Sequence, residues 1–213
     1  LASAPELGRL ETHRHDLVEV SRQVLSELAE PLYLRAMAAL RGKDAGPGRE
    51  KVRAQLAAES RRFLDLVSDL DALLATRPEF LLGRWIASAR RWGDGDPREA
   101  ALYEWNARNI ITLWGPRDSV LHEYARKEWS GLLSGFYLPR WRLFFRRLDE
   151  ALEAGRDGGR DFDPRAWEAE VSAWEEAWTR GTESYATEPR GDAVEVSRAL
   201  LEKAGPYDEE KSF

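Results

Sequence analysis

Apolar residues recur at helical spacing along almost the whole chain, and this period constrains the fold more than any other feature. The stretch from Arg49 to Ala75 shows it most clearly. Its apolar stripe comprises Val52, Leu56, Phe63, Leu66, Leu70 and Leu73. Residues three, four or seven positions apart lie on one face of an α-helix. Because no stretch alternates apolar and polar residues as a strand would, the sequence predicts an all-α fold.

Proline and glycine divide this periodic sequence into about eight helices of a multi-helix bundle. Proline lacks the amide proton that a helix interior needs, and glycine favours loops. Asp16 is predicted as the N-cap of the first helix, and Pro31 is expected to kink or split that helix. The predicted helices cover residues 16–40, 49–75, 78–92, 97–114, 119–134 and 140–154, a stretch from residue 164 onward, and a last one from about 192 to 205.

Composition excludes several classes of protein. The chain has 213 residues, enough for one domain, and a net charge of −6, which disfavours a general nucleic-acid binder. It contains no cysteine and no run of about 20 apolar residues, so neither disulfides nor a membrane span is expected. The basic cluster is expected to pair with carboxylates or cover apolar surface with its stems; it comprises Arg140, Arg142, Arg146 and Arg147.

No self-contained catalytic centre is visible, and no metal or cofactor is expected. The three histidines are His13, His15 and His122, and Arg126 stands where a zinc-protease helix would carry its second histidine. Phosphate-binding glycine loops and a nucleophile elbow are also missing. The 38 carboxylates give no sign of two that face each other across a sugar-sized gap.

Nine tryptophans make the chain rich in large rings. One helical stripe holds Trp167, Val171, Trp174 and Trp178, which predicts packing against neighbouring helices, although a surface for a partner or a sugar stays open. Trp85 and Trp92, seven residues apart, are interpreted in the same way.

Trp114 differs from the other tryptophans because it lies at a predicted helix end, directly before Gly115-Pro116. A ring at a turn is freer to face a ligand than a ring in the middle of a helix. Aromatic rings suit sugars, since a pyranose presents an apolar C–H face to them. Tyr124 follows closely enough to bring a hydroxyl to the same place.

Several blocks of sequence resemble the C-terminal helical domain of the α-N-acetylglucosaminidases, glycoside hydrolase family 89. The most specific are "YEWNARNIITLWGP" from Tyr103 and "LHEYARKEWSGLLSGFYLPRWRLF" from Leu121. Similar blocks begin at His15, Phe80 and Pro189, so the resemblance spans nearly the whole chain.

The resemblance implies that residues 1–213 are the C-terminal helical domain of a larger glycosidase whose catalytic barrel lies upstream. Such an enzyme releases terminal α-linked N-acetylglucosamine from glycans with retention, using two glutamates that belong to the barrel. We therefore assign no catalytic residue and expect the isolated chain to be inactive. The implied partners are the barrel of the same polypeptide and the terminal sugar of the glycan.

In this family the helical domain supplies one wall of the active-site cleft. The residues that match this wall are Trp114 in the "LWGP" turn, Val120, and Tyr124 in the following helix. The stretch "RDSVLHEY" is one residue longer than the animal pattern, which shifts Tyr124 relative to Trp114. Arg108 and Arg140 also match family arginines and are expected to hold helices together through carboxylates.

A stand-alone helical interaction protein or carbohydrate-binding module is the alternative to an enzyme domain. The chain does not begin with methionine, which suggests a fragment of a longer protein. Its arginine-rich, lysine-poor composition is typical of a GC-rich bacterial genome. Both a secreted and a cytoplasmic location stay open, as do the natural glycan and the oligomeric state.

Overall fold

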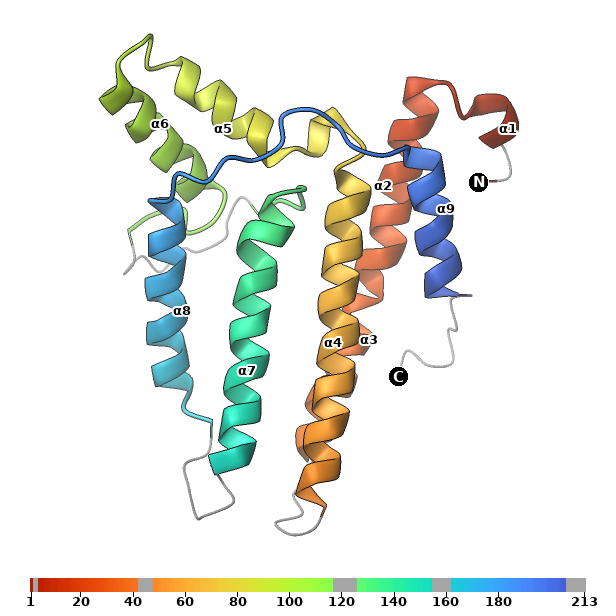
Figure 1. Cartoon of the computed structure of the whole chain (residues 1–213), viewed down its shortest axis with the longest axis vertical. Helices are drawn as coiled ribbons and strands as arrows, with labels where there is room; N and C mark the ends of the chain where they lie inside the picture. The colour runs from red at the N-terminus through yellow and green to blue at the C-terminus, as the bar shows by residue number, and fades with distance from the viewer. Residues whose placement is uncertain (2–3, 42–47, 117–125, 155–161, 206–213) are drawn as a thin grey trace.

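The computed structural model describes residues 1, 4–41, 48–116, 126–154 and 162–205, and within them the fold is all-α (Figure 1). A single turn, α1 (Ala4–Leu7), comes first, and a 3₁₀ turn, η1 (Pro78–Phe80), and a π-turn, η2 (Leu133–Tyr137), precede α5 and α7. None of the described helices is long and apolar enough to cross a membrane. The eight longer helices are α2 (Glu11–Glu27), α3 (Ala29–Arg41), α4 (Arg49–Leu74), α5 (Leu82–Arg91), α6 (Pro97–Ile110), α7 (Leu138–Ala154), α8 (Pro164–Thr179) and α9 (Ala193–Ala204). This confirms the predicted all-α bundle of about eight helices.

The 26-residue helix α4 is the central element of the bundle. It packs against α2, α3, α7 and α9. Helix α8 lies on the far side of α7, and α5 and α6 form a hairpin at one end of the bundle (Figure 1). An extended connection, residues 180–192, runs across that end from α8 to α9 and is called the α8–α9 connection below.

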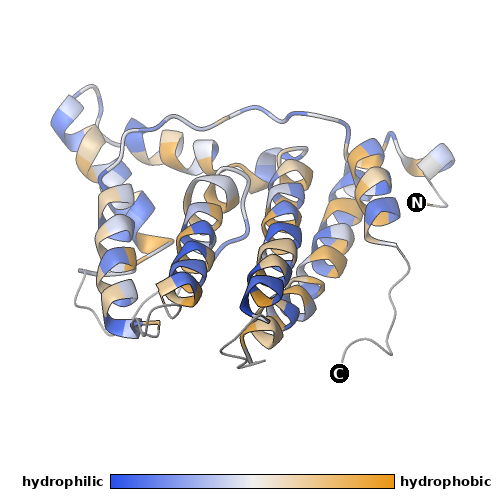
Figure 2. Ribbon diagram, turned by 60° about the horizontal axis from the view of Figure 1, so that its bottom comes forward, coloured by the Kyte–Doolittle hydropathy of each residue, from blue (hydrophilic) through white to orange (hydrophobic). Residues whose placement is uncertain are grey.

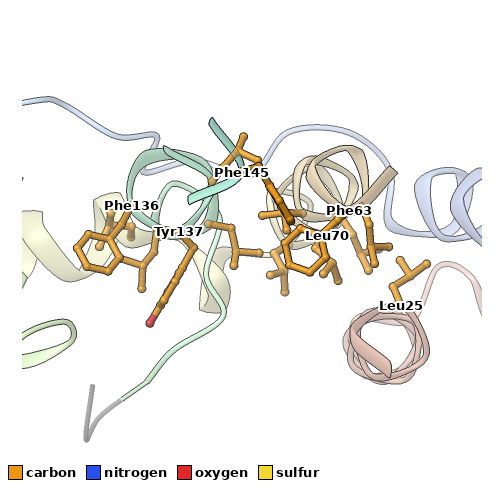
Figure 3. Close-up of a cluster of buried hydrophobic side chains, with 14 of the residues drawn as sticks. Leu25, Phe63, Leu70, Phe136, Tyr137 and Phe145 are labelled. Atoms are coloured by element: carbon orange, nitrogen blue, oxygen red, sulfur yellow. The ribbon is translucent and has the colours of Figure 1, made fainter. Parts of the chain in front are cut away.

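One continuous core joins these helices. It runs from Leu25 on α2, through Phe63 and Leu70 on α4, to Phe145 on α7 and Phe136 in η2 (Figure 3). Hydrophobic and hydrophilic residues occupy different sides of individual helices, as expected for amphipathic helices around a shared core (Figure 2). Of the stripe predicted on α4, all members are buried except Val52, which is half-buried near the end of the helix.

Aspartates begin three of the helices. The carboxylates of Asp96, Asp163 and Asp192 each accept hydrogen bonds from backbone N–H groups of the first turn, and the first two are followed by proline. Asp192 also pairs with Arg14 of α2. Burial opposes the charged form of Asp192, but hydrogen bonds from Glu195 N–H and Arg14 outweigh it and hold its pKa below the ordinary value.

Two predictions about the first helix had different outcomes. The N-cap prediction for Asp16 was wrong, because α2 begins five residues earlier, at Glu11. Contacts that local sequence does not reveal hold this extra turn: the Glu11 carboxylate lies 2.6 Å from Arg77 Nη1. The expected break near Pro31 is confirmed, since α2 ends at Glu27 and Pro31 lies in the first turn of α3, where its missing N–H has no cost.

Candidate functional site

A turn after α6 holds Trp114 in a backbone conformation that is rare for a large residue. Its φ angle is +64°, in the left-handed region. Its N–H reaches back to the carbonyl of Asn109 at 2.7 Å and closes the turn. Ile111 and Leu113, on the same turn, are buried, whereas the Trp114 side chain is partly exposed. Strained backbone of this kind persists only where surrounding contacts impose it, and it occurs often at functional sites.

Arg108, in the last turn of α6, ties the helix that leads into this turn to the α8–α9 connection. Its side chain is fully buried, and its Nε and Nη2 lie 3.0 and 2.8 Å from Glu104 Oε1. Its Nη2 also donates to the carbonyl of Glu183, at 2.8 Å, in the α8–α9 connection. The guanidinium lies over the rings of Trp178 and Tyr185. The predicted structural role of Arg108 is confirmed in part, because its close carboxylate, Glu104, lies on the same helix and the link to the α8–α9 connection is made mainly through the Glu183 carbonyl.

Residues 128–131 attach the C-terminal end of the segment between α6 and η2 to the bundle, as Arg108 does near its N-terminal end. Ser130 N–H donates to the carbonyl of Phe80 at 2.8 Å, and Leu82 N–H donates to the carbonyl of Ser130 at 3.0 Å. Glu128 pairs with Arg22 of α2 at 2.7 Å. Both ends of the segment between α6 and η2 are therefore fixed to the bundle.

Asp71 of α4 caps the turn that follows. Its Oδ1 accepts hydrogen bonds from the N–H groups of Gly131 and Ser134, at 2.8 and 2.9 Å. Gly131 has a φ of +88°, which other residues avoid. These interactions correct the prediction of a helix over residues 119–134, because residues 126–130 of it are extended. Asp71 was missed because its partners lie 60 residues away in the sequence.

A π-turn connects this cap to α7. The helix predicted over residues 140–154 begins earlier, because η2 runs directly into α7 and Pro139 is the second residue of α7. The wide turn accommodates a residue that has no N–H to give to the ladder. Arg140 follows and bonds to the buried carboxylate of Glu175 on α8, at 2.9 Å. The structural role predicted for Arg140 is therefore confirmed as well.

Glycines allow the α8–α9 connection to lie directly on α5 and η2. A Cβ on Gly83 would come within 2.3 Å of the Ala186 carbonyl oxygen, and one on Gly135 within 2.8 Å of the Tyr185 hydroxyl. Tyr185 also accepts a hydrogen bond from Trp178 Nε1, at 3.1 Å. The connection thus packs on α5, η2 and α8 and holds these three elements together.

Of the three residues predicted to line a cleft, only Trp114 lies within the described residues. Val120 and Tyr124 lie outside them, as does His122. His15 stacks on Phe80, with ring centroids 5.5 Å apart, which is a packing role. In the described ranges, no group of three or more histidine, aspartate or glutamate side chains could hold a metal ion.

The other aromatic and basic stripes have mixed outcomes. On α8, Trp174 and Trp178 pack on Phe136, as the core interpretation predicted. The expected pairing of the basic cluster holds for Arg146 and Arg147, which both bond to Glu170. The packing interpretation was wrong for Trp92, which is 74% exposed, but Trp85, although 39% exposed, bonds to α6 through Ala107 and packs on Trp129.

Comparison with known proteins assigns the chain to a family. The family model described as "Alpha-N-acetylglucosaminidase (NAGLU) C-terminal domain" matches residues 1–203, nearly the whole chain. This chain belongs to that family. The resemblance noted in the sequence, to the helical domain of glycoside hydrolase family 89, is therefore confirmed.

Individual relatives of the α-N-acetylglucosaminidase family agree with this assignment. The human α-N-acetylglucosaminidase is 33% identical over 206 residues, which cover 97% of this chain and 26% of the human protein. A family 89 glycoside hydrolase from Clostridium perfringens, in complex with 2-acetamido-1,2-dideoxynojirmycin, superposes with a TM-score of 0.76 and 27% identity. The structure of the Clostridium enzyme with its substrate GlcNAc-α-1,4-galactose superposes with a TM-score of 0.74 and 26% sequence identity. Both superpositions cover 94% of this chain and 22% of the Clostridium chain, so the chain spans about a quarter of its relatives' length.

Proposed function

We propose that this chain is the helical domain of an α-N-acetylglucosaminidase, a retaining exo-glycosidase that releases terminal α-linked N-acetylglucosamine. The observation that carries the proposal is the family match over residues 1–203. It is supported by the Clostridium relative, which has the same fold and whose structure was obtained with its substrate GlcNAc-α-1,4-galactose. The longer polypeptide that contains this domain is called the parent enzyme below.

The contribution of this domain to the reaction is one wall of the active-site cleft, built on the Trp114 turn. The Trp114 ring stacks on the apolar face of the sugar and excludes water from the pocket. Val120 and Tyr124 extend the wall, Val120 with an apolar contact and Tyr124 with a hydroxyl. The strained backbone of Trp114 supports this role, because such strain persists only where surrounding contacts impose it, and the buried Arg108 holds the helix that leads into the turn.

The acid/base and nucleophile lie in the barrel of the parent enzyme rather than in this chain. Retention requires two carboxyl groups roughly 5–5.5 Å apart on opposite sides of the glycosidic bond. Three buried or half-buried carboxylates of the described residues are held by arginines: Glu104 by Arg108, Glu128 by Arg22 and Glu175 by Arg140. An arginine keeps its partner carboxylate charged and occupies its oxygens. Such a carboxylate is suited to a structural role and is a poor nucleophile or general acid.

Hydrolysis of a chromogenic α-N-acetylglucosaminide tests the proposal, with the 213-residue chain and the parent enzyme assayed side by side. We expect activity from the parent enzyme and none from the chain. Activity in the chain alone would locate the carboxylate pair among these helices and would overturn the division of roles. An inactive parent enzyme, with an isolated chain that binds N-acetylglucosamine, would instead favour a carbohydrate-binding module.

A further inference from the structure

The α5–α6 hairpin carries an exposed apolar surface that packing within the chain does not explain. Trp92 is 74% exposed, and Leu102, Trp85 and Tyr103 are exposed beside it. These four residues are called the hairpin surface. In the described part of the chain, they include every large aromatic side chain that is exposed. Clustered exposed aromatic residues mark a surface that another molecule or domain covers.

A shallow pocket of about 320 Å³ opens between the two helices of the hairpin. Its lining includes Trp85, Trp92, Tyr103 and Ile110, and its polar side chains outside the aromatic rings are Ser88 and Asn106. A sugar needs several hydrogen-bonding groups around its hydroxyls, whereas an apolar side chain needs none. The pocket therefore suits an apolar side chain of a protein better than a sugar.

The hairpin surface is rigid before anything binds to it. Trp85 Nε1 donates to the carbonyl of Ala107 at 2.9 Å, which fixes α5 against α6. The Trp85 ring packs on Trp129, with ring centroids 5.8 Å apart. At the tip, Gly93 lies so close to Ala100 that a Cβ would come within 2.5 Å of its backbone nitrogen. A pre-organised surface loses little entropy when it is covered.

We propose that the hairpin surface docks onto the remainder of the parent enzyme, which places an apolar side chain in the pocket between α5 and α6. This inference rests on the proposed function. Family relatives have about three quarters of their length outside the region that matches this chain, so a large neighbour is present in the parent enzyme. Continuity with the Trp114 turn supports the choice of occupant. Ile110 lines the pocket, and Trp114 follows it by four residues, so one neighbouring domain covers both.

The composition of the hairpin surface agrees with a docking interface. Interfaces combine a centre rich in tryptophan and tyrosine with a polar, charged rim. Around the rings lie the exposed Arg91 and Arg98 and the ion pair of Arg90 with Glu104, at 2.9 Å. Because Glu104 also holds Arg108, this rim is connected to the support of the Trp114 turn.

Hydroxyl-radical footprinting of the intact parent enzyme tests the proposal directly. Trp92 is the reporter, and its labelling rate is compared with that of the same peptide after the protein is unfolded. Docking should reduce the exposed fraction of Trp92 from 74% to below roughly 10%. The labelling rate in the folded parent enzyme should then be about one tenth of the unfolded rate, against about three quarters for an uncovered ring. Val20 of α2 and Leu34 of α3, which are exposed away from the hairpin, are the controls and should remain labelled.

Other occupants give other results, and each would overturn the proposal. Labelling of Trp92 at the rate expected for an exposed ring would mean that nothing covers it. Protection that appears only when N-acetylglucosamine is added would make the pocket a sugar site. Protection that disappears on dilution would make the hairpin surface a contact between two copies.

A pair of double variants of the parent enzyme gives a second test. Trp92→Ser with Tyr103→Ser should separate the unfolding of this domain from that of the remainder in calorimetry, whereas Val20→Ser with Leu34→Ser should not. Coincident unfolding in both variants would contradict docking through this surface. Neither readout depends on hydrolysis, so protection of Trp92 in a parent enzyme that fails to cleave α-N-acetylglucosaminides would uphold the docking and refute the function.

Discussion

At the scale of single residues, Trp114 combines backbone strain with a partly exposed ring. A left-handed conformation disfavours a residue with a Cβ by roughly 1–2 kcal/mol, and glycine avoids that cost. The turn would therefore be more stable with glycine at this position. A tryptophan there implies a benefit from the ring that outweighs the strain, and contact with the sugar is the benefit we propose.

Replacement of Trp114 by both alanine and glycine in the parent enzyme separates the ring from the backbone. Both variants lose the apolar contact, so kcat/KM should fall about 10- to 100-fold in each. Stability should differ, because Trp114→Gly also relieves the strain and should unfold at a higher urea concentration than Trp114→Ala. Steady-state kinetics and urea titration measure the two effects. Unchanged kcat/KM in both variants would remove Trp114 from the cleft.

Arg108 has no proposed contact with the sugar, but its replacement should destabilise the fold around the site. Arg108→Ala leaves Glu104 with one exposed partner, Arg90, and removes the donor to the carbonyl of Glu183. Removal of one partner of a buried ion pair destabilises by about 3–5 kcal/mol, and we expect a loss of this size in urea unfolding. Arg180→Ala is the matched control, since its exposed pair with Glu176 is worth roughly 0.5 kcal/mol. Equal effects of the two substitutions would contradict the supporting role of Arg108.

At the scale of elements, sequence periodicity predicted what local physics controls and missed what distant contacts decide. The α4 stripe and the helix starts at residues 97 and 164 follow from neighbouring residues, so they were found. Residues 126–130 have helical spacing but are not helical, and Ser130 pairs with Phe80 and Leu82 instead. Trp85 and Trp92 share a helix face, yet the period does not tell whether that face meets the core. Trp114 was found as a ring at a turn, but its strain depends on Asn109 and Arg108.

The contact between α4 and α7 carries a pH-dependent prediction. Asp149 accepts two hydrogen bonds from Arg53, at 2.7 and 2.8 Å. The Arg53 hydrogen bonds hold the pKa of Asp149 below its ordinary value of 3.8, so the pair stabilises the fold above that pH and ceases to do so as the carboxylate is protonated. Asp149→Asn should therefore lower stability at pH 7, by less than about 1 kcal/mol because the pair is partly exposed to solvent.

Urea titrations of the Asp149→Asn variant at several pH values check this sign. The difference from the unmodified chain should begin to shrink as pH falls below about 4, where the unfolded state binds the proton first. It should vanish only below the lower folded-state pKa, where Asp149 is neutral in both states. Addition of 1 M salt at pH 7 is the control and should also reduce the difference, because salt screens exposed pairs. A difference that grows toward low pH would contradict the assignment.

At the scale of the whole molecule, one core extends from α2 to α8, so the chain should unfold as a single unit. Phe136 lies at the α8 end of that core, fully buried, with Tyr137, Trp174 and Trp178 around its ring (Figure 3). Its cluster continues through Phe145 and Phe63 to Leu25, at the opposite end. A substitution at Phe136 should therefore also destabilise helices that do not contact this residue.

Phe136→Ala should lower the free energy of unfolding by about 3–5 kcal/mol and move the urea midpoint down by about 1–2 M. Far-UV circular dichroism reports all helices, whereas tryptophan fluorescence reports mainly the rings around α5, α7 and α8. The urea midpoints measured by the two probes should fall by the same amount, because helices that share one core unfold together. If fluorescence changed at a lower urea concentration than circular dichroism, the α2–α3–α4 part would be stable without α7 and α8. The support of the Trp114 turn would then unfold independently of the helices that carry most of the core.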